Sequence, residues 1–173
     1  LGDMFSALSH RNFRLFFFGQ FVSLTGSWMQ NTAQAWLVYR LTRDPLMLGL
    51  VALVGQFPVL ILGFYAGFAV DHADHLRLVK RTQFLAMAQA AMLALLTWGG
   101  HIEVWHVFAL SLSLGVVNAF DMPARQVLIG ELVPVDHRHN AIALNSTIVN
   151  ASRIIGPALA GLAIAYAGEA GCF

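Results

Sequence analysis

Hydrophobic runs of membrane length alternate with short polar segments along this chain of 173 residues. No residue is charged from Leu15 to Tyr39, and none from Leu46 to Val70. A helix needs about 20 apolar residues to cross the hydrocarbon core of a bilayer. The pattern therefore predicts an all-α fold, a polytopic membrane helix bundle with five transmembrane helices and the start of a sixth at 168–173. The five predicted spans cover about 15–39, 46–70, 79–98, 104–120 and 140–167.

The polar segments between these runs carry their own signals. Asp44 followed by Pro45 is typical of a helix start, because aspartate can cap the first turn and proline suits its first position. Residues 121–139 are predicted to form the longest and most polar linker. Within that linker, Asp121 and Arg125 are spaced to pair across one helical turn.

The composition favours a lipid environment. Hydrophobic residues make up 58% of the chain and charged residues only 11%, whereas soluble domains carry about 25% charge. The net charge of +1 gives no electrostatic reason to expect a nucleic-acid partner. A single cysteine, Cys172, excludes an intramolecular disulfide and a cysteine-rich metal site.

Basic residues are distributed unevenly between the two predicted faces of the membrane. One face holds Arg40 and Arg43. The other holds Arg11, Arg14, Arg77, Lys80, Arg81, Arg125 and Arg138. Because short loops rich in lysine and arginine remain in the cytoplasm, we expect the N-terminus and the 71–81 loop to be cytoplasmic, with the lipid bilayer as a partner of the chain.

Uncharged polar residues interrupt the apolar spans. Gln30 and Gln34 lie four positions apart and hence on one helical face. As a set, these residues are predicted to line a polar cavity, and the alternative for each is a hydrogen bond between helices. The set comprises Gln30, Asn31, Gln34, Gln56, Asn118 and Asn150.

Arg153 is the one charged residue of the predicted span 140–167 and lies near its centre. A basic side chain at that depth costs about 2.5–3.5 kcal/mol unless it meets a partner or water. We therefore expect Arg153 to face the bundle interior and to join the cavity set, with Asn150, Gln56, the amides of the first span or an anionic substrate as its partner. The alternative is a structural arginine bound to backbone carbonyls or to a segment outside this chain.

A cluster of charged residues separates the second and third spans. Two acids, two histidines and three basic residues lie between Asp71 and Arg81, which is typical of a tight turn at a membrane surface. His72 and His75 could also share a metal ion. The other histidine pair, in 137–139, has a spacing that does not place both side chains on one helical face. We therefore predict no metal site and no enzymatic activity.

The loop from Gly67 to Arg77 resembles the signature between the second and third helices of the major facilitator superfamily of transporters. Gly67 and Asp71 match that signature in place. His72 stands where arginine is usual and Asp74 where glycine is usual, while Arg77 restores one basic charge a position late.

Two further stretches strengthen the resemblance. The segment from Arg153 to Gly161 is similar to the Gly-Pro motif of the fifth helix in exporters of the superfamily. The segment from Asn118 to Gln126 resembles the branch of bacterial exporters that includes the enterobactin exporter. The resemblance covers nearly the whole chain, although the predicted span 104–120 lacks the arginine that exporters often carry in their fourth helix.

The resemblance implies that residues 1–173 form the incomplete N-terminal six-helix bundle of a twelve-helix protein, with the C-terminal half of the same chain as the missing partner. It also implies a conformational lock in which Asp71 faces the N-terminus of a helix in the other half. The residues of this lock are Gly67, Asp71, His72, Arg77, Asp121 and Arg125. In the fifth helix, the resemblance assigns a motif for bending and close packing to Gly156, Pro157 and Gly161.

The function that the resemblance implies is secondary active transport. The chain would belong to a multi-pass protein of the bacterial cytoplasmic (inner) membrane that exports a small amphiphile, such as a siderophore or a drug, by alternating access. Transport would use a proton gradient and no cofactor. The alternative is a small helical membrane protein that acts as an interaction or assembly subunit, and a membrane metalloenzyme is the least favoured class.

Overall fold

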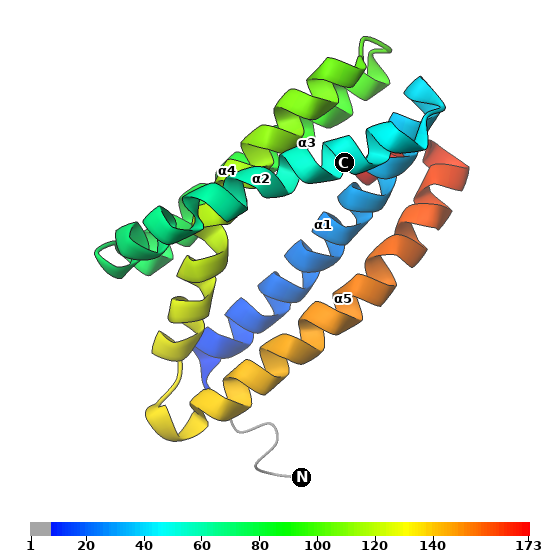
Figure 1. Cartoon of the computed structure of the whole chain (residues 1–173). Helices are drawn as coiled ribbons and strands as arrows, with labels where there is room; N and C mark the ends of the chain where they lie inside the picture. Colours follow the sequence, from blue (N-terminus) through cyan, green and yellow to red (C-terminus); the bar gives the residue numbers. More distant parts are fainter. Residues whose placement is uncertain (1–7) are drawn as a thin grey trace.

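The computed structural model describes residues 8–173 as a bundle of long helices (Figure 1). The predicted all-α fold is confirmed. In chain order the elements are α1 (Arg11–Thr42), α2 (Pro45–Asp71), α3 (His75–Trp98), α4 (Val104–Glu131), the 3-10 helix η2 (Val135–His137), α5 (Arg138–Ala167) and the 3-10 helix η3 (Glu169–Cys172).

Local sequence explains where α2 and α3 begin. The Asp44 carboxylate accepts a hydrogen bond from the backbone N–H of Leu46 (2.9 Å), and Pro45 is the first residue of α2, as predicted. Asp74 caps α3 in a similar way by accepting a hydrogen bond from the backbone N–H of Arg77 (2.9 Å). The connection between α2 and α3 is therefore a tight turn.

Helix α4 shows that the linker predicted at 121–139 was wrong, because the helix continues to Glu131. The polar residues of this segment remain helical because they are paired. Arg125 binds Asp121 one turn earlier, and Glu131 binds His75 at the start of α3. Polarity in this segment reflects bonds between helices rather than an exposed connection.

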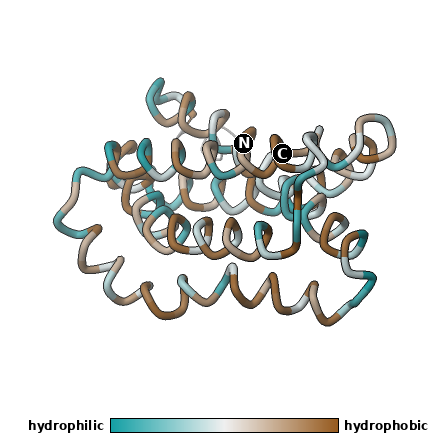
Figure 2. Tube along the Cα trace, turned by 90° about the horizontal axis from the view of Figure 1, so that it is seen from above, coloured by the Kyte–Doolittle hydropathy of each residue, from teal (hydrophilic) through white to brown (hydrophobic). Residues whose placement is uncertain are grey.

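Three of the five helical segments in residues 8–173 are long and apolar enough to cross a membrane: α2, α4 and the segment Val135–Ala167, which contains α5. Figure 2 shows hydrophobic residues along the helices and hydrophilic residues gathered mainly near their ends. These features describe a multi-pass membrane protein. The remaining two spans, in α1 and α3, stay predictions.

Two of the three main helix pairs, α2 with α4 and α1 with α5, join helices that are not neighbours in the chain. Helix α4 packs on α2 and α3, whereas α1 packs on α5 (Figure 1). The contact between α2 and α4 is close at one point, where Gly115 of α4 lies against Gly55 and Pro58 of α2. Small residues permit such close approach of two membrane helices.

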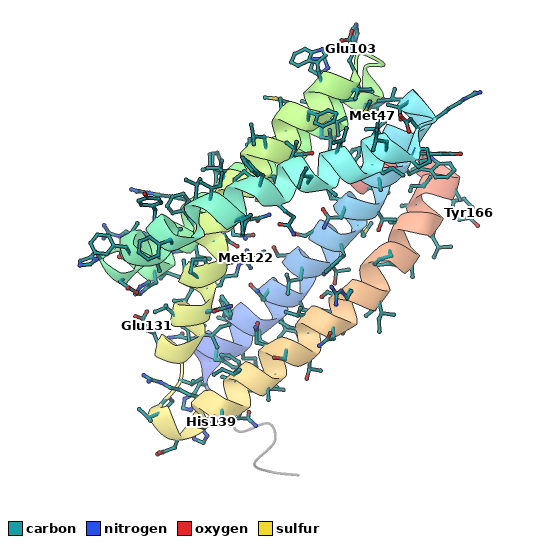
Figure 3. The ribbon with its side chains drawn as sticks, in the orientation of Figure 1. Met47, Glu103, Met122, Glu131, His139 and Tyr166 are labelled. Carbon is teal, nitrogen blue, oxygen red and sulfur yellow. The ribbon has the colours of Figure 1, made fainter. Side chains whose placement is uncertain are left out.

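The two ends of the bundle carry different residues. We call the end that carries residues 71–81 the loop end. Glu131 and His139 lie at the loop end, and Glu103 and Tyr166 lie at the opposite end (Figure 3). The helices run in alternating directions (Figure 1). The start of α1 and the connection between α4 and α5 therefore lie toward the loop end, and the α1–α2 and α3–α4 connections lie at the opposite end. The cytoplasmic orientation of the loop end stays a prediction.

The segment 168–173, predicted as a turn and the start of a sixth span, forms η3 after Gly168. Gly168 has a φ of 73°, a conformation that glycine adopts without strain. Glu169 is buried, and its carboxylate pairs with the guanidinium of Arg40 in α1 at 2.9 Å. This ion pair fastens the end of α5 to the end of α1.

The contact at Gly115 generates a first prediction. A Cβ atom at this position would overlap the carbonyl oxygen of Gly55 and lie 3.0 Å from the ring of Pro58. Overpacking of this kind costs about 1–3 kcal/mol, so Gly115→Ala should lower the melting temperature of the detergent-purified protein. The matched control is Gly63→Ala in α2, where a Cβ meets nothing within 4 Å. Equal melting temperatures for both variants would contradict the close contact.

Candidate functional site

A buried ion pair connects three helices toward the loop end. In α4, the Nε of Arg125 donates to a carboxylate oxygen of Asp121 at 2.5 Å. The other carboxylate oxygen accepts a hydrogen bond from the hydroxyl of Thr82 in α3 (2.5 Å). The guanidinium of Arg125 also donates to the side-chain oxygen of Gln20 in α1. The sequence predicted the pair itself, but it did not predict Thr82 and Gln20 as its partners.

Two glutamines of the predicted cavity set also bond between helices. The amide of Gln30 donates to the side-chain oxygen of Gln89 in α3 at 2.7 Å, and Gln89 donates to the carbonyl of Leu110 in α4. The amide of Gln34 donates to the hydroxyl of Ser111 in α4 at 2.7 Å. Both glutamines thus make the helix-to-helix hydrogen bonds that the sequence analysis left open as the alternative. Their role in lining a cavity stays a prediction.

The other members of the cavity set lie apart from these glutamines. Asn31, Gln56 and Asn150 are exposed, and Asn118 is half-buried. The amide of Asn150 donates to the carbonyl of Ser146 one turn earlier in α5 (2.9 Å). Within residues 8–173, the seven predicted cavity residues do not come together as one enclosed cluster.

The Gly-Pro motif of α5 forms the close contact between α5 and α1. A Cβ at Gly156 would overlap the Cβ of Trp28 and lie 2.9 Å from the carbonyl oxygen of Thr25. One turn earlier, Ser152 is fully buried and accepts a hydrogen bond from the Thr25 hydroxyl (3.3 Å). At Gly161, by contrast, a Cβ would meet nothing within 4 Å, so in the described chain only the first glycine of the motif makes a close approach.

Arg153 lies on α5 beside this contact, and its residue is exposed. The carbon atom of its guanidinium is 5.2 Å from the centre of the Trp28 ring, which is the geometry of a cation–π contact. The expectation that Arg153 faces the interior of the bundle stays a prediction.

An apolar groove runs between α1, α2 and α5. Its volume is about 600 Å³, which is within the usual range of small-molecule sites. The lining is mostly hydrophobic and includes two aromatic side chains of α1. The lining residues are Thr32, Ala35, Trp36, Tyr39, Leu48, Gly161 and Ile164.

The predicted lock residues of the 71–81 loop are largely exposed. Among residues 8–173, Asp71 forms no ion pair, and Arg77 pairs instead with its neighbour Asp74 at 3.1 Å. A ring nitrogen of His72 lies 3.0 Å from the carbonyl oxygen of Phe68. At Gly67, a Cβ would meet nothing within 4 Å, so no contact in the described chain requires glycine there.

His75 and Glu131 are residues that the predicted lock did not include. One ring nitrogen of His75 lies 2.9 Å from the Glu131 carboxylate, and the other lies 3.1 Å from the carbonyl oxygen of Val70. His75 therefore links the ends of α2 and α4 to the start of α3. In the part of the chain that the structure describes, no three histidine, cysteine, aspartate or glutamate side chains gather as a metal site would need.

Comparisons with known proteins match nearly the whole chain. The model of a family described as transmembrane secretion effector matches residues 3–173. The chain is 28% identical over 153 residues to the staphyloferrin A transporter of Staphylococcus aureus. The aligned residues make up 88% of this chain and 38% of the relative. The chain is 24% identical over 157 residues to macrolide efflux protein A of Streptococcus pyogenes, an alignment that covers 88% of this chain and 39% of the relative. It is 26% identical over 162 residues to multidrug efflux pump Tap of Mycolicibacterium fortuitum, where the alignment covers 89% of this chain and 39% of the relative. The chain spans less than two fifths of the length of these relatives, and no solved structure matches it significantly.

The buried ion pair generates a second prediction. Arg125→Gln leaves the Asp121 carboxylate buried without its counter-charge, which costs about 3–5 kcal/mol. We therefore expect a large loss of stability against denaturant in detergent. The matched control is Arg77→Gln, which breaks the pair with Asp74 whose side chains are 80% and 53% exposed and should leave stability unchanged. If both variants unfold at the same denaturant concentration, the network does not hold the three helices.

Proposed function

The chain belongs to the transmembrane secretion effector family of the major facilitator superfamily, and from this premise we propose that it is the N-terminal part of a bacterial exporter. The observation that carries the proposal is the family match over residues 3–173. Relatives named for macrolide efflux and multidrug efflux support the outward direction of transport, and a relative named for staphyloferrin A transport supports a siderophore as one class of cargo. Members of this superfamily are transporters, so we assign no covalent chemistry to the chain.

The proposed cargo is a small amphiphile such as a siderophore or a drug. The groove of about 600 Å³ between α1, α2 and α5 supports this size and an apolar contact surface. Arg153, which follows the buried Ser152 of the α1–α5 contact, adds a polar group near the middle of α5. The C-terminal half of the protein would complete the enclosure of the site.

The proposed mechanism is alternating access in the bacterial inner membrane, with the N-terminus and the 71–81 loop in the cytoplasm and with energy from a proton gradient. The exposed carboxylate of Asp71 at the loop end supports a contact with the other half of the protein, because an acid at the positive N-terminus of a helix is stabilising. The bonded pair Asp121–Arg125 would keep α4 in register with α1 and α3 during the movement.

The test of this function is transport by the full-length protein in inside-out membrane vesicles. We expect accumulation of a macrolide, of staphyloferrin A or of the dye ethidium inside these vesicles when a proton gradient is imposed, and loss of accumulation when a protonophore collapses the gradient. Vesicles without the protein serve as the control. Protein that is folded in the membrane and moves none of these three compounds would refute the proposal.

The close contact at Gly156 generates a third prediction. Gly156→Ala forces α5 away from Trp28 and Thr25 of α1 at a cost of about 1–3 kcal/mol, and it should abolish most transport in the same vesicles. The control is Gly26→Ala in α1, next to Thr25 and outside the groove, where a Cβ meets nothing within 4 Å, so transport should continue at nearly the normal rate. If the two variants transport equally, the α1–α5 contact is not needed for the movement.

A further inference from the structure

Arg153 lies at the middle of α5. It is fifteen positions after Arg138 and fourteen before Ala167, the two ends of the helix. At a rise of about 1.5 Å per residue, each end is about 21 Å or more away along the helix axis. The guanidinium, which stays charged at any physiological pH, is therefore far from the polar residues at either end of the bundle.

No acid neutralises this charge in the described part of the chain. The ion pairs among residues 8–173 involve Arg40, His75, Arg77 and Arg125, and none involves Arg153. Its one aromatic neighbour, Trp28, contacts the guanidinium through the face of the indole ring. A cation–π contact uses the face of the guanidinium and leaves the N–H groups at its edge free to donate to an anion.

The surroundings of Trp28 are rigid. Gly156 brings the backbone of α5 against Trp28 and Thr25, and the Thr25 hydroxyl donates to the buried Ser152. The indole ring under Arg153 is therefore held by the closest contact between the two helices. A site on packed helices keeps its geometry better than a site on a loop.

The apolar groove continues from this point along the same two helices. On α5, Gly161 and Ile164 of the groove lie eight and eleven positions after Arg153, and hence on the same face. On α1, Thr32 and Trp36 lie four and eight positions after Trp28, again on one face. The cation and the groove therefore lie along the same two helices, about 12–16 Å apart along the helix axis.

We propose that Arg153, supported by Trp28, binds the carboxylate of an anionic amphiphile whose apolar part lies in the groove between α1, α2 and α5. This inference rests on the proposed export function and specifies the charge of its cargo. The depth of Arg153 favours a transported molecule over a lipid phosphate as the source of the anion, because lipid head groups lie at the membrane surface.

The test is equilibrium binding of two matched dyes to the full-length protein in detergent: a xanthene dye with a free carboxylate and the methyl ester of the same dye. We expect the protein to bind the carboxylate form at least about tenfold more tightly, the factor that a charged hydrogen bond supplies. Arg153→Gln should weaken binding of the carboxylate form by about tenfold or more and leave the ester unaffected. Arg153→Lys should fall between the two, because lysine keeps the charge but not the two-pronged geometry.

The control variant is Lys80→Gln, which removes an exposed cation of α3 and should change neither affinity. Melting temperatures confirm that each variant is folded. Equal affinity of the unmodified protein for the two dyes, or an equal loss of both in Arg153→Gln, would overturn the inference. So would a change confined to the affinity of Arg153→Gln for vesicles containing anionic lipid, since the arginine would then serve a lipid.

This binding assay separates the inference from the export proposal. A protein that exports ethidium but shows no preference for the carboxylate dye refutes the anionic site and leaves export standing. A protein that prefers the carboxylate dye but moves no compound across the vesicle membrane refutes export and leaves the site standing.

Discussion

The guanidinium of Arg125 is the group through which α1, α3 and α4 hold one another. It binds Asp121 in its own helix and Gln20 in α1, while Asp121 in turn binds Thr82 in α3. In lipid there is no water to replace a broken bond of this kind, so every polar group must find its partner within the protein. The hydrogen bonds of the Asp121–Arg125 pair to Gln20 and Thr82 thus fix how far α1, α3 and α4 are shifted along one another.

The helices of the bundle are held together by two kinds of contact: close backbone packing and side-chain hydrogen bonds. Gly115 in α4 and Gly156 in α5 bring helix backbones together, so α2 with α4, and α1 with α5, are close pairs. Helix α1 meets α3 and α4 differently, through side-chain hydrogen bonds such as Gln30 with Gln89 and Gln34 with Ser111. Backbone contacts depend on shape, whereas the hydrogen bonds depend on matching polar groups at equal depth.

Features with short-range causes were predictable from the sequence, and those that depend on helix rotation were not. Uncharged runs predicted the helices, Asp44 predicted the start of α2, and a spacing of four predicted the bond between Asp121 and Arg125. The partner Gln20, by contrast, lies 105 positions away from Arg125, and spacing carries no information on such contacts. The predicted linker after residue 120 failed for the same reason, because paired charges and solvated charges are alike in sequence.

The order of helix packing has a consequence for how the protein is made. Helix α1 leaves the ribosome before α2, α3 and α4, but its closest partner, α5, begins only at Arg138. The surface of α1 around Thr25 must therefore stay covered by lipid or by the insertion machinery while α2, α3 and α4 are synthesised. Because contacts between distant segments form slowly, the bundle matures by a late closure of α5 onto α1, and a nascent chain interrupted before Gly156 would expose that surface.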